Sequence, residues 1–422
     1  MAALDNKVQA LVADVGNTSL GLAQIQDLRE AVKAFRSTGK KAYLYSSGMG
    51  SFGGGTDDYY LASAFDEIWM QPNTEIGITG LNIEVPFLKG LLDKVGITAE
   101  FYARHEYKNA AASFLNSAFT PQYREETERL GQSLYDRIVA DVCADRKLDE
   151  NIFRRLVNRA PLSADEGLKE GLIDKTAFKP DLLEKVLDET KGEMIDVYDY
   201  AYSLEESGKK LPTIAFLVVD GTISGGKSLS NPLQGESIVG SETLIQQLDE
   251  IANNKYVKAL LLRINSPGGS YTASAEIWNA LSRLKEKRKL PIVVSMGDYA
   301  ASGGYFIALP GDKILAEAST VTGSIGVLEA RWFWPACGIS LRLTGAKSSL
   351  ATMPAFYRQI INSASGKKRF SIGRWIMFIA ILPQKLPWQG IFRLRKWTSW
   401  RGAGYGPVFR RLKTVWPMKS AE

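Results

Sequence analysis

Two stretches of the chain repeat the same order of apolar and polar positions. Each contains a buried apolar strand, an amphipathic helix whose apolar residues recur every three or four positions, a basic cluster and a second apolar strand. The strand, helix and strand lie at 6–15, 25–35 and 42–45 in the first copy and at 255–264, 277–284 and 292–294 in the second. The pattern predicts one strand–helix–strand unit that occurs twice.

A glycine-rich turn and an aromatic helix start complete each copy. Tyr59 aligns with Tyr305, and residues 74–80 align with residues 320–326, at the same offset of 246 positions. Successive strands joined by a helix must run parallel, so the repeat predicts an α/β fold with mostly parallel sheets and flanking helices. After the first unit, a capping box beginning at Ser163 is expected to open a short helix.

A charged segment at 190–212, interrupted by glycine and proline, is typical of a domain boundary. We therefore expect a first repeat at 1–196, a linker at 197–212, a second repeat at 213–329 and a basic tail at 330–422.

The composition indicates a globular protein without a metal or disulfide framework. Apolar residues make up 45% of the chain and charged residues 23%. The two cysteines, Cys143 and Cys337, have no metal-ligand spacing and are expected to be small buried apolar groups. The first residues lack a signal-peptide pattern, and no uncharged apolar run reaches the about 20 residues that span a bilayer. We expect no cofactor and no metal.

Two glycine motifs suggest nucleotide binding but have the wrong context. Residues 221–228 fit the P-loop pattern, yet turn residues follow them and the next helix is expected near Ser241. Residues 48–53 fit the dinucleotide fingerprint, but the repeat explains them as the counterpart of the turn at 297–304. We interpret neither as a cofactor site.

Serine chemistry is the strongest candidate in the second copy. Ser302 follows a buried strand and opens a helix, a position that suits a nucleophile. Gly268 and Gly269 follow the neighbouring parallel strand and, with Gly303, can offer amides to an oxyanion. Both segments could instead be simple tight turns between strand and helix.

A serine nucleophile needs a base, and two candidates lie close together. His105 is the only histidine, so a Ser-His-Asp triad would have to use it. Lys108 is the alternative, provided that burial lowers its pKa far enough to keep some of the amine neutral. The apolar residues after Lys108 suit such a pocket, but composition and spacing leave both candidates open.

Five motifs together resemble the bacterial signal peptide peptidase A (protease IV) family in its long two-repeat form. They lie at 106–110, 219–223, 265–269, 302–305 and 322–326. The resemblance implies that Ser302 is the nucleophile and Lys108, from the first repeat, the general base. Thr56 stands opposite Ser302 in the first copy, so that copy has lost its serine.

The resemblance also implies properties of the whole protein. The expected fold is crotonase/ClpP-like, and the expected assembly is a homotetramer on the periplasmic face of the bacterial inner membrane. The implied substrates are released signal peptides and other unfolded hydrophobic peptides. Compared with the family, we expect the chain to lack the amino-terminal membrane anchor and the start of the first repeat, and the family pattern stops near Val327.

The tail beyond the pattern has a different composition. Residues 331–422 hold 17 Lys and Arg but one acidic residue, and seven of the nine tryptophans. Shifting the reading frame of this segment restores motifs expected in the family, so we hypothesise that residues from about 329 onward are out of frame or disordered. The product would then have low activity and poor solubility. A basic membrane-associating tail, with residues 375–382 at the lipid interface, is the alternative. The tail shows no clean helical period, and we expect no nucleic-acid partner.

Two other functions compete with the peptidase. The same fold class hosts enzymes of acyl-thioester chemistry, which would bind coenzyme A. The chain could also be a non-catalytic truncated homologue.

Overall fold

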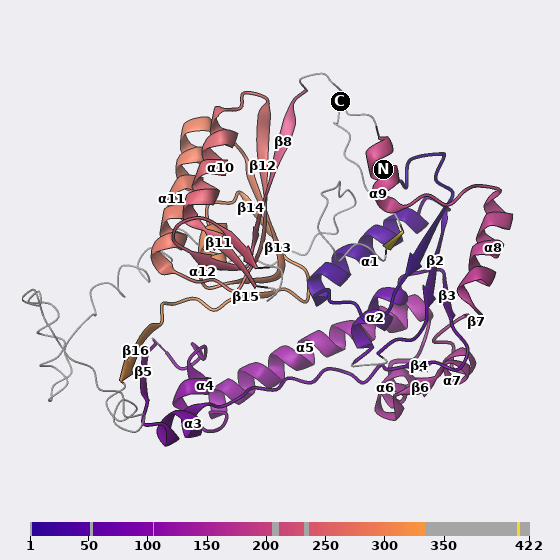
Figure 1. The fold of residues 1–422 in the computed structure, drawn as a ribbon, viewed down its shortest axis with the longest axis horizontal. Coiled ribbons are helices and arrows are strands. Elements are labelled where there is room, and N and C mark those ends of the chain that lie inside the picture. Colours follow the sequence, from indigo (N-terminus) through magenta and orange to yellow (C-terminus); the bar gives the residue numbers. More distant parts are fainter. Residues whose placement is uncertain are drawn as a thin grey trace, which may run out of the picture. The chain divides into compact units, whose positions relative to one another are not determined.

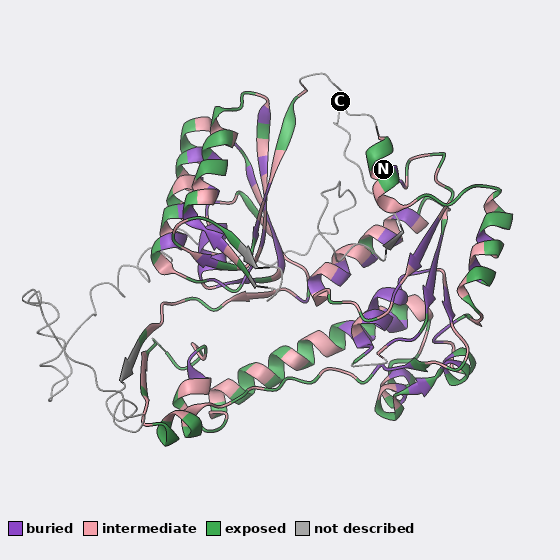
Figure 2. Cartoon of the chain, in the orientation of Figure 1, coloured by how far each residue is buried: buried purple, intermediate pink, exposed green. Residues whose placement is uncertain are grey.

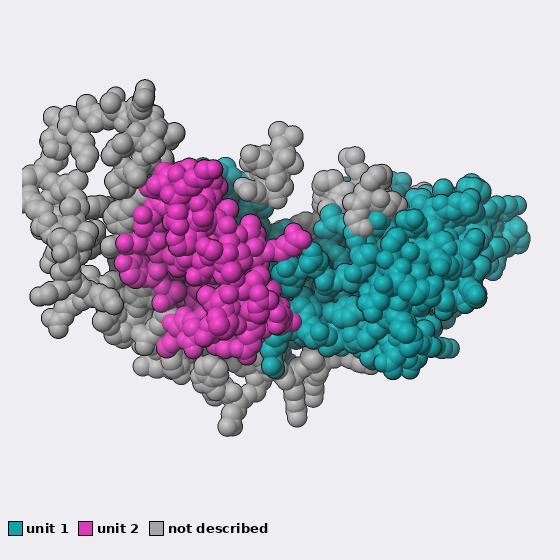
Figure 3. Space-filling model, turned by 90° about the horizontal axis from the view of Figure 1, so that it is seen from below, with its two compact units in different colours: residues 1–83, 129–323, 394–422 teal, residues 84–128, 324–393 magenta. Residues whose placement is uncertain are grey.

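The computed structural model describes residues 2–50, 54–103, 105–204, 211–231, 236–333 and 412–413 (Figure 1). The chain divides into two compact units, which Figure 3 colours separately. Unit 1 contains Met1–Ile83, Arg129–Gly323 and Leu394–Glu422, and unit 2 contains Glu84–Glu128 and Ser324–Arg393.

The first copy is built on a parallel sheet in unit 1. The strands β1 (Ala10–Asp14), β2 (Lys41–Ser46), β3 (Glu67–Met70) and β7 (Lys175–Thr176) lie side by side in this order, and β17 (Leu412–Lys413) pairs antiparallel with β1. Helix α1 (Leu22–Arg36) connects β1 to β2, and α2 (Thr56–Ala62) follows β2. Five of the six residues of β2 are buried, which explains its continuous apolar run.

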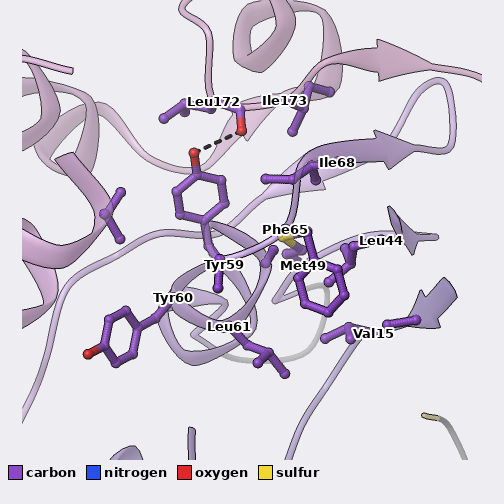
Figure 4. Close-up of a cluster of buried hydrophobic side chains, with 14 of the residues drawn as sticks. Val15, Leu44, Met49, Tyr59, Tyr60, Leu61, Phe65, Ile68, Leu172 and Ile173 are labelled. Atoms are coloured by element: carbon purple, nitrogen blue, oxygen red, sulfur yellow. Dashed lines mark hydrogen bonds between the residues drawn. The ribbon is translucent and has the colours of Figure 1, made fainter. Parts of the chain in front are cut away.

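Further helices and a small sheet complete the first copy. They are the antiparallel pair β4 (Glu75–Ile76) and β6 (Leu162–Ser163), and the helices α5 (Pro121–Arg146), α6 (Glu150–Arg159), α7 (Ala164–Lys169), α8 (Lys179–Thr190) and α9 (Val197–Ser203). The predicted capping box is confirmed, since Ser163 and Glu166 exchange hydrogen bonds at the start of α7. In the core, the Tyr59 hydroxyl donates to the Leu172 carbonyl at 2.8 Å (Figure 4).

The second copy repeats this architecture. Its parallel sheet has the order β14 (Lys313–Leu315), β13 (Ile292–Ala301), β12 (Val257–Ser266) and β8 (Thr213–Asp220), and β15 (Val321–Gly323) pairs with the end of β13. The helices are α10 (Ser241–Asn253), α11 (Tyr271–Arg288) and α12 (Gly303–Ala308). Strands β9 (Thr222–Ser224), β10 (Leu229–Asn231) and β11 (Glu236–Gly240) form a separate small sheet.

The predicted fold class is therefore confirmed, because both copies place parallel strands beside crossover helices. Buried residues are concentrated on the central strands, such as β2 and β13, while exposed residues lie mainly on the helices and loops (Figure 2). The P-loop interpretation is excluded by β9, which occupies the middle of the motif at 221–228, and the next helix begins at Ser241 as expected.

Unit 2 has its own small elements. Its strand β5 (Thr98–Tyr102) pairs antiparallel with β16 (Glu329–Phe333), and its helices are α3 (Lys89–Lys94) and α4 (Ala112–Leu115). Ring pairs Phe101–Phe114, 5.5 Å apart, and Phe87–Phe119, 5.3 Å apart, hold these elements together.

Several expectations stay predictions. The domain boundaries remain so, although α9 lies in the expected linker and packs Tyr200 into the core of the first copy. The hypotheses about the tail fall on residues that are, apart from 329–333 and 412–413, outside the described part, as does Cys337. Cys143 is buried, as expected. Within the described residues, no helix is long and apolar enough to cross a membrane.

Candidate active site

Ser302 occupies a sharp turn between β13 and α12. Its backbone has φ 51° and ψ −113°, a left-handed conformation that is unfavourable for a residue with a side chain. Its amide donates to the Gly323 carbonyl of β15 at 2.8 Å, and its carbonyl accepts from the Phe306 amide. Such a conformation costs about 1–3 kcal/mol and is common at functional sites.

Glycines allow the loop after β12 to approach this turn closely. A Cβ atom on Gly268 would lie 2.8 Å from the Ser302 Cβ and 2.7 Å from the Gly303 amide nitrogen. A Cβ on Gly303 would lie 2.4 Å from the Ser274 Oγ and 3.3 Å from the Gly269 amide nitrogen. A side chain at Gly268 would therefore push the two loops apart, and one at Gly303 would collide with the Ser274 hydroxyl of α11.

The three glycine amides differ in their hydrogen bonding. The Gly268 amide donates to the Ser266 Oγ at 3.2 Å. The Gly269 and Gly303 amides donate to no acceptor among the described residues. The Gly268 amide is thus engaged within its own loop, whereas the other two are available to a ligand oxygen beside Ser302.

Lys108 lies in unit 2, shortly after β5. Its Nζ donates to the Ser324 Oγ at 2.9 Å and to the Ser324 carbonyl at 2.5 Å. Burial lowers the pKa of Lys108 below its usual value, and the negative charge of Glu126 partly opposes this effect. Ser324 directly follows Gly323, the residue whose carbonyl accepts from the Ser302 amide in unit 1.

His105 has a different environment from Lys108. It is exposed and adopts a left-handed backbone conformation with φ 68°. Lys108, by contrast, is partly buried.

The first copy cannot repeat the serine arrangement. The Thr56 hydroxyl donates to the Gly80 carbonyl at 3.0 Å and accepts from the Gly80 amide at 3.1 Å. The buried carboxylate of Asp58 accepts from the amides of Asn17 and Thr18, each at 2.8 Å. The loop after β1 corresponds in the repeat to the glycine loop after β12. In the first copy, two amides of this loop are already bonded to the Asp58 carboxylate.

Two contributors to this region were not predicted from the sequence. Ser324 lies in the motif at 322–326, but the sequence predicts no role for its side chain. The sequence assigns no role to Asp298 either, yet its carboxylate contacts the first copy. No cluster of three or more His, Cys, Asp or Glu that could hold a metal occurs within the described residues.

Comparison with known proteins finds a family match in both copies. The sequence model of Peptidase family S49 matches residues 34–192 and 284–335. The chain is 30% identical to Protease 4 of Salmonella typhi over 342 residues, which cover 76% of this chain and 53% of that protein. It is 29% identical to the chloroplastic serine protease SPPA of Arabidopsis thaliana over 347 residues, covering 78% of this chain and 49% of that protein.

A shorter relative and a solved structure match parts of the chain. The putative signal peptide peptidase SppA of Enterococcus faecium is 40% identical over 123 residues, 29% of this chain and 35% of that protein. The structure of ClpP1 from Listeria monocytogenes is 21% identical, with a TM-score of 0.17, and covers 23% of this chain and 47% of that chain. The chain spans about half the length of Protease 4 of Salmonella typhi and of the Arabidopsis thaliana protease.

Proposed function

The chain belongs to peptidase family S49, and we propose that it is a serine endopeptidase in which Ser302 is the nucleophile and Lys108 the general base. The observation that carries this proposal is the left-handed backbone of Ser302 at the turn from β13 into α12. A strand–turn–helix junction of this kind presents a nucleophile's side chain away from the backbone that holds it.

The proposed reaction proceeds through an acyl-enzyme. The Ser302 Oγ attacks the carbonyl carbon of the peptide bond while the neutral Lys108 amine takes the hydroxyl proton. The resulting ammonium group gives this proton to the leaving amine as the C–N bond breaks. Water then attacks the ester while Lys108 accepts one of its protons, and Lys108 gives this proton to the Ser302 oxygen as the ester C–O bond breaks.

The amides of Gly269 and Gly303 are the proposed donors to the oxyanion. Neither has an acceptor among the described residues, and the glycine packing brings their loops together. Gly268 supports the site by allowing this close approach, since its own amide donates to Ser266. Donors fixed before the reaction stabilise the developing charge without reorganisation.

Lys108 is favoured over His105 because its surroundings suit a neutral amine. Burial lowers its pKa, and its two hydrogen bonds to Ser324 fix the orientation of Nζ. The bonds from the Ser302 amide and from Lys108 end on consecutive residues, Gly323 and Ser324.

The proposed substrates are released signal peptides and other unfolded hydrophobic peptides. The similarity to the putative signal peptide peptidase SppA of Enterococcus faecium motivates the signal peptides. We also propose a homotetramer attached to the periplasmic face of a bacterial inner membrane, by analogy with the family. Sedimentation of the purified chain, with and without lipid vesicles, tests the assembly and the attachment separately.

The nucleophile is tested by comparing equivalent positions of the two copies. Hydrolysis of an unfolded protein such as casein is measured for the full chain and for Ser302→Ala and Thr56→Ala. We expect Ser302→Ala to abolish hydrolysis and Thr56→Ala to retain it, because the Thr56 hydroxyl is engaged with Gly80. Unchanged hydrolysis by Ser302→Ala would refute the assignment.

A further inference from the structure

One face of helix α1 in the first copy contacts the segments of the second copy around Ser302. The residues on this face are Ala23, Gln26 and Asp27, spaced three and four positions apart as neighbours on a helix surface are. Their partners lie on β13, on β12 and just before β15, within unit 1. The helix that connects two strands of the first copy thus also contacts the second copy.

The contact nearest to Ser302 is made by Asp298, four residues earlier in β13. Its Oδ1 accepts from the amides of Ala23 at 2.8 Å and Gln24 at 3.3 Å. The residue before α1 is Gly21, which offers no side-chain cap, so Asp298 satisfies helix-terminal amides that α1 cannot satisfy itself. A Cβ on Gly21 would lie 2.2 Å from the Asp298 Cγ, so the glycine is needed for this approach.

Two further contacts join α1 to the neighbours of β13, namely β12 and the segment that leads into β15. Gln26 Oε1 accepts from the Ser319 hydroxyl at 2.6 Å and from its amide at 3.1 Å, two residues before β15 begins. Asp27 pairs with Arg263 of β12 at 2.5 Å. Gln26 and Ser319 are both buried, so these hydrogen bonds are shielded from water.

Helix α1 therefore holds the end of β13 directly, through the Asp298 carboxylate, and indirectly, through its contacts with β12 and the segment before β15. Ser302 follows immediately and has a strained backbone that its surroundings must maintain. The turn's other backbone anchor, the Gly323 carbonyl, belongs to the strand that follows Ser319.

We propose that Asp298 is a positioning residue for Ser302, which acts by capping helix α1 of the first copy. The copy without a nucleophile thereby orients the nucleophile of the other copy. This inference rests on the proposed function for its kinetic consequences, although the positioning itself is measurable without activity.

The test compares two carboxylates that cap helices in the full chain. Asp298→Ala removes the cap of α1, and Asp149→Ala removes the cap of α6, where Asp149 accepts from the amides of Asn151 and Ile152. Both variants are measured for kcat and KM of peptide hydrolysis and for hydrogen–deuterium exchange of segment 298–306. Asp298→Asn, which keeps an oxygen acceptor, tests for rescue.

We expect Asp298→Ala to lower kcat about 10- to 100-fold with little change in KM, since small displacements of a reacting group have effects of this size. Exchange in 298–306 should rise in Asp298→Ala and stay at the wild-type level in Asp149→Ala. Asp298→Asn should recover part of both properties.

Hydrogen–deuterium exchange of segment 298–306 does not depend on activity. It therefore distinguishes a wrong positioning role for Asp298 from a wrong peptidase function. Wild-type exchange in Asp298→Ala would overturn the positioning role, whatever the activity. Faster exchange in a chain whose wild type hydrolyses no peptide would support the positioning and refute the peptidase function. Equal losses of kcat in Asp298→Ala and Asp149→Ala would also overturn the inference, because loss of a cap anywhere would then suffice.

Discussion

The side chain of Lys108 donates hydrogen bonds to both the hydroxyl and the carbonyl oxygen of Ser324. These bonds hold the amine in one orientation, while burial lowers its pKa. The combination gives a lysine that is fixed in position and more readily neutral than an exposed one. The pH dependence of activity then reports on the residues around it.

Glu126 is expected to set the acid limb of the pH profile. Its negative charge raises the pKa of Lys108 against the larger effect of burial. Replacing it by glutamine lowers the pKa of Lys108 further, so more of the amine is neutral at a given pH. The acid limb of kcat/KM against pH should move to lower pH in Glu126→Gln. Glu128→Gln, which changes an exposed carboxylate paired with Arg124, should leave the limb in place; a shift of equal size there would refute this explanation.

The strained backbone at Ser302 is expected to lower the free energy of unfolding of the wild-type chain. Ser302→Gly keeps the left-handed backbone without the penalty of a side chain, so the free energy of unfolding should rise by about 1 kcal/mol while hydrolysis is lost. Denaturant unfolding measures this change. Lys289→Gly is the matched control, because Lys289 is also left-handed, with φ 50°, at the end of α11. It should gain stability too and keep wild-type hydrolysis; a destabilised Ser302→Gly would argue against strain at this turn.

Glu317 is expected to make stability fall as the pH rises toward neutrality. Desolvation, followed by the charge of Asp27, raises the pKa of Glu317 to about 7. The folded state therefore holds a proton that the unfolded chain releases near its ordinary pKa of about 4.3. The resulting stability is fully present below that value and is lost as the pH rises through about 7.

Glu317→Gln should remove this part of the pH dependence. Glu317 is half-buried, so solvent screens its charge and reduces the effect. The difference in free energy of unfolding between the wild type and Glu317→Gln should change by about 1–2 kcal/mol between pH 4.5 and 7.5. Chemical unfolding at a series of pH values measures it. Parallel stability curves for the two proteins would show that Glu317 does not titrate in this range.

The first copy is expected to contribute structure without a second active site. The Asp58 carboxylate is buried on the amides of Asn17 and Thr18, so Asp58→Ala leaves two donors without an acceptor. The free energy of unfolding should fall by about 1–3 kcal/mol, while kcat per folded molecule stays unchanged. A large loss of kcat in a variant that remains folded would show that this loop takes part in catalysis.

The repeated elements could be predicted because each apolar run has the period of its own secondary structure. The strands at β1 and β12 and the helices α1 and α11 follow directly from such local patterns. The contact of Asp298 with Ala23 could not be predicted, because the two residues are 275 positions apart in the sequence. No local sequence pattern at either residue indicates the other as its partner. Similarly, a glycine-rich loop predicts available amides, but only the structure shows that Ser266 engages that of Gly268.

The identity of the base is the central claim, and the activities of Lys108→Ala and His105→Ala test it most directly. Both variants change unit 2 within four positions of each other, and Lys94→Ala, at an exposed lysine of α3 in the same unit, controls for loss of charge. The kcat for hydrolysis of an unfolded protein should be lost in Lys108→Ala and retained in the other two. Loss of hydrolysis in His105→Ala with retention in Lys108→Ala would contradict the account.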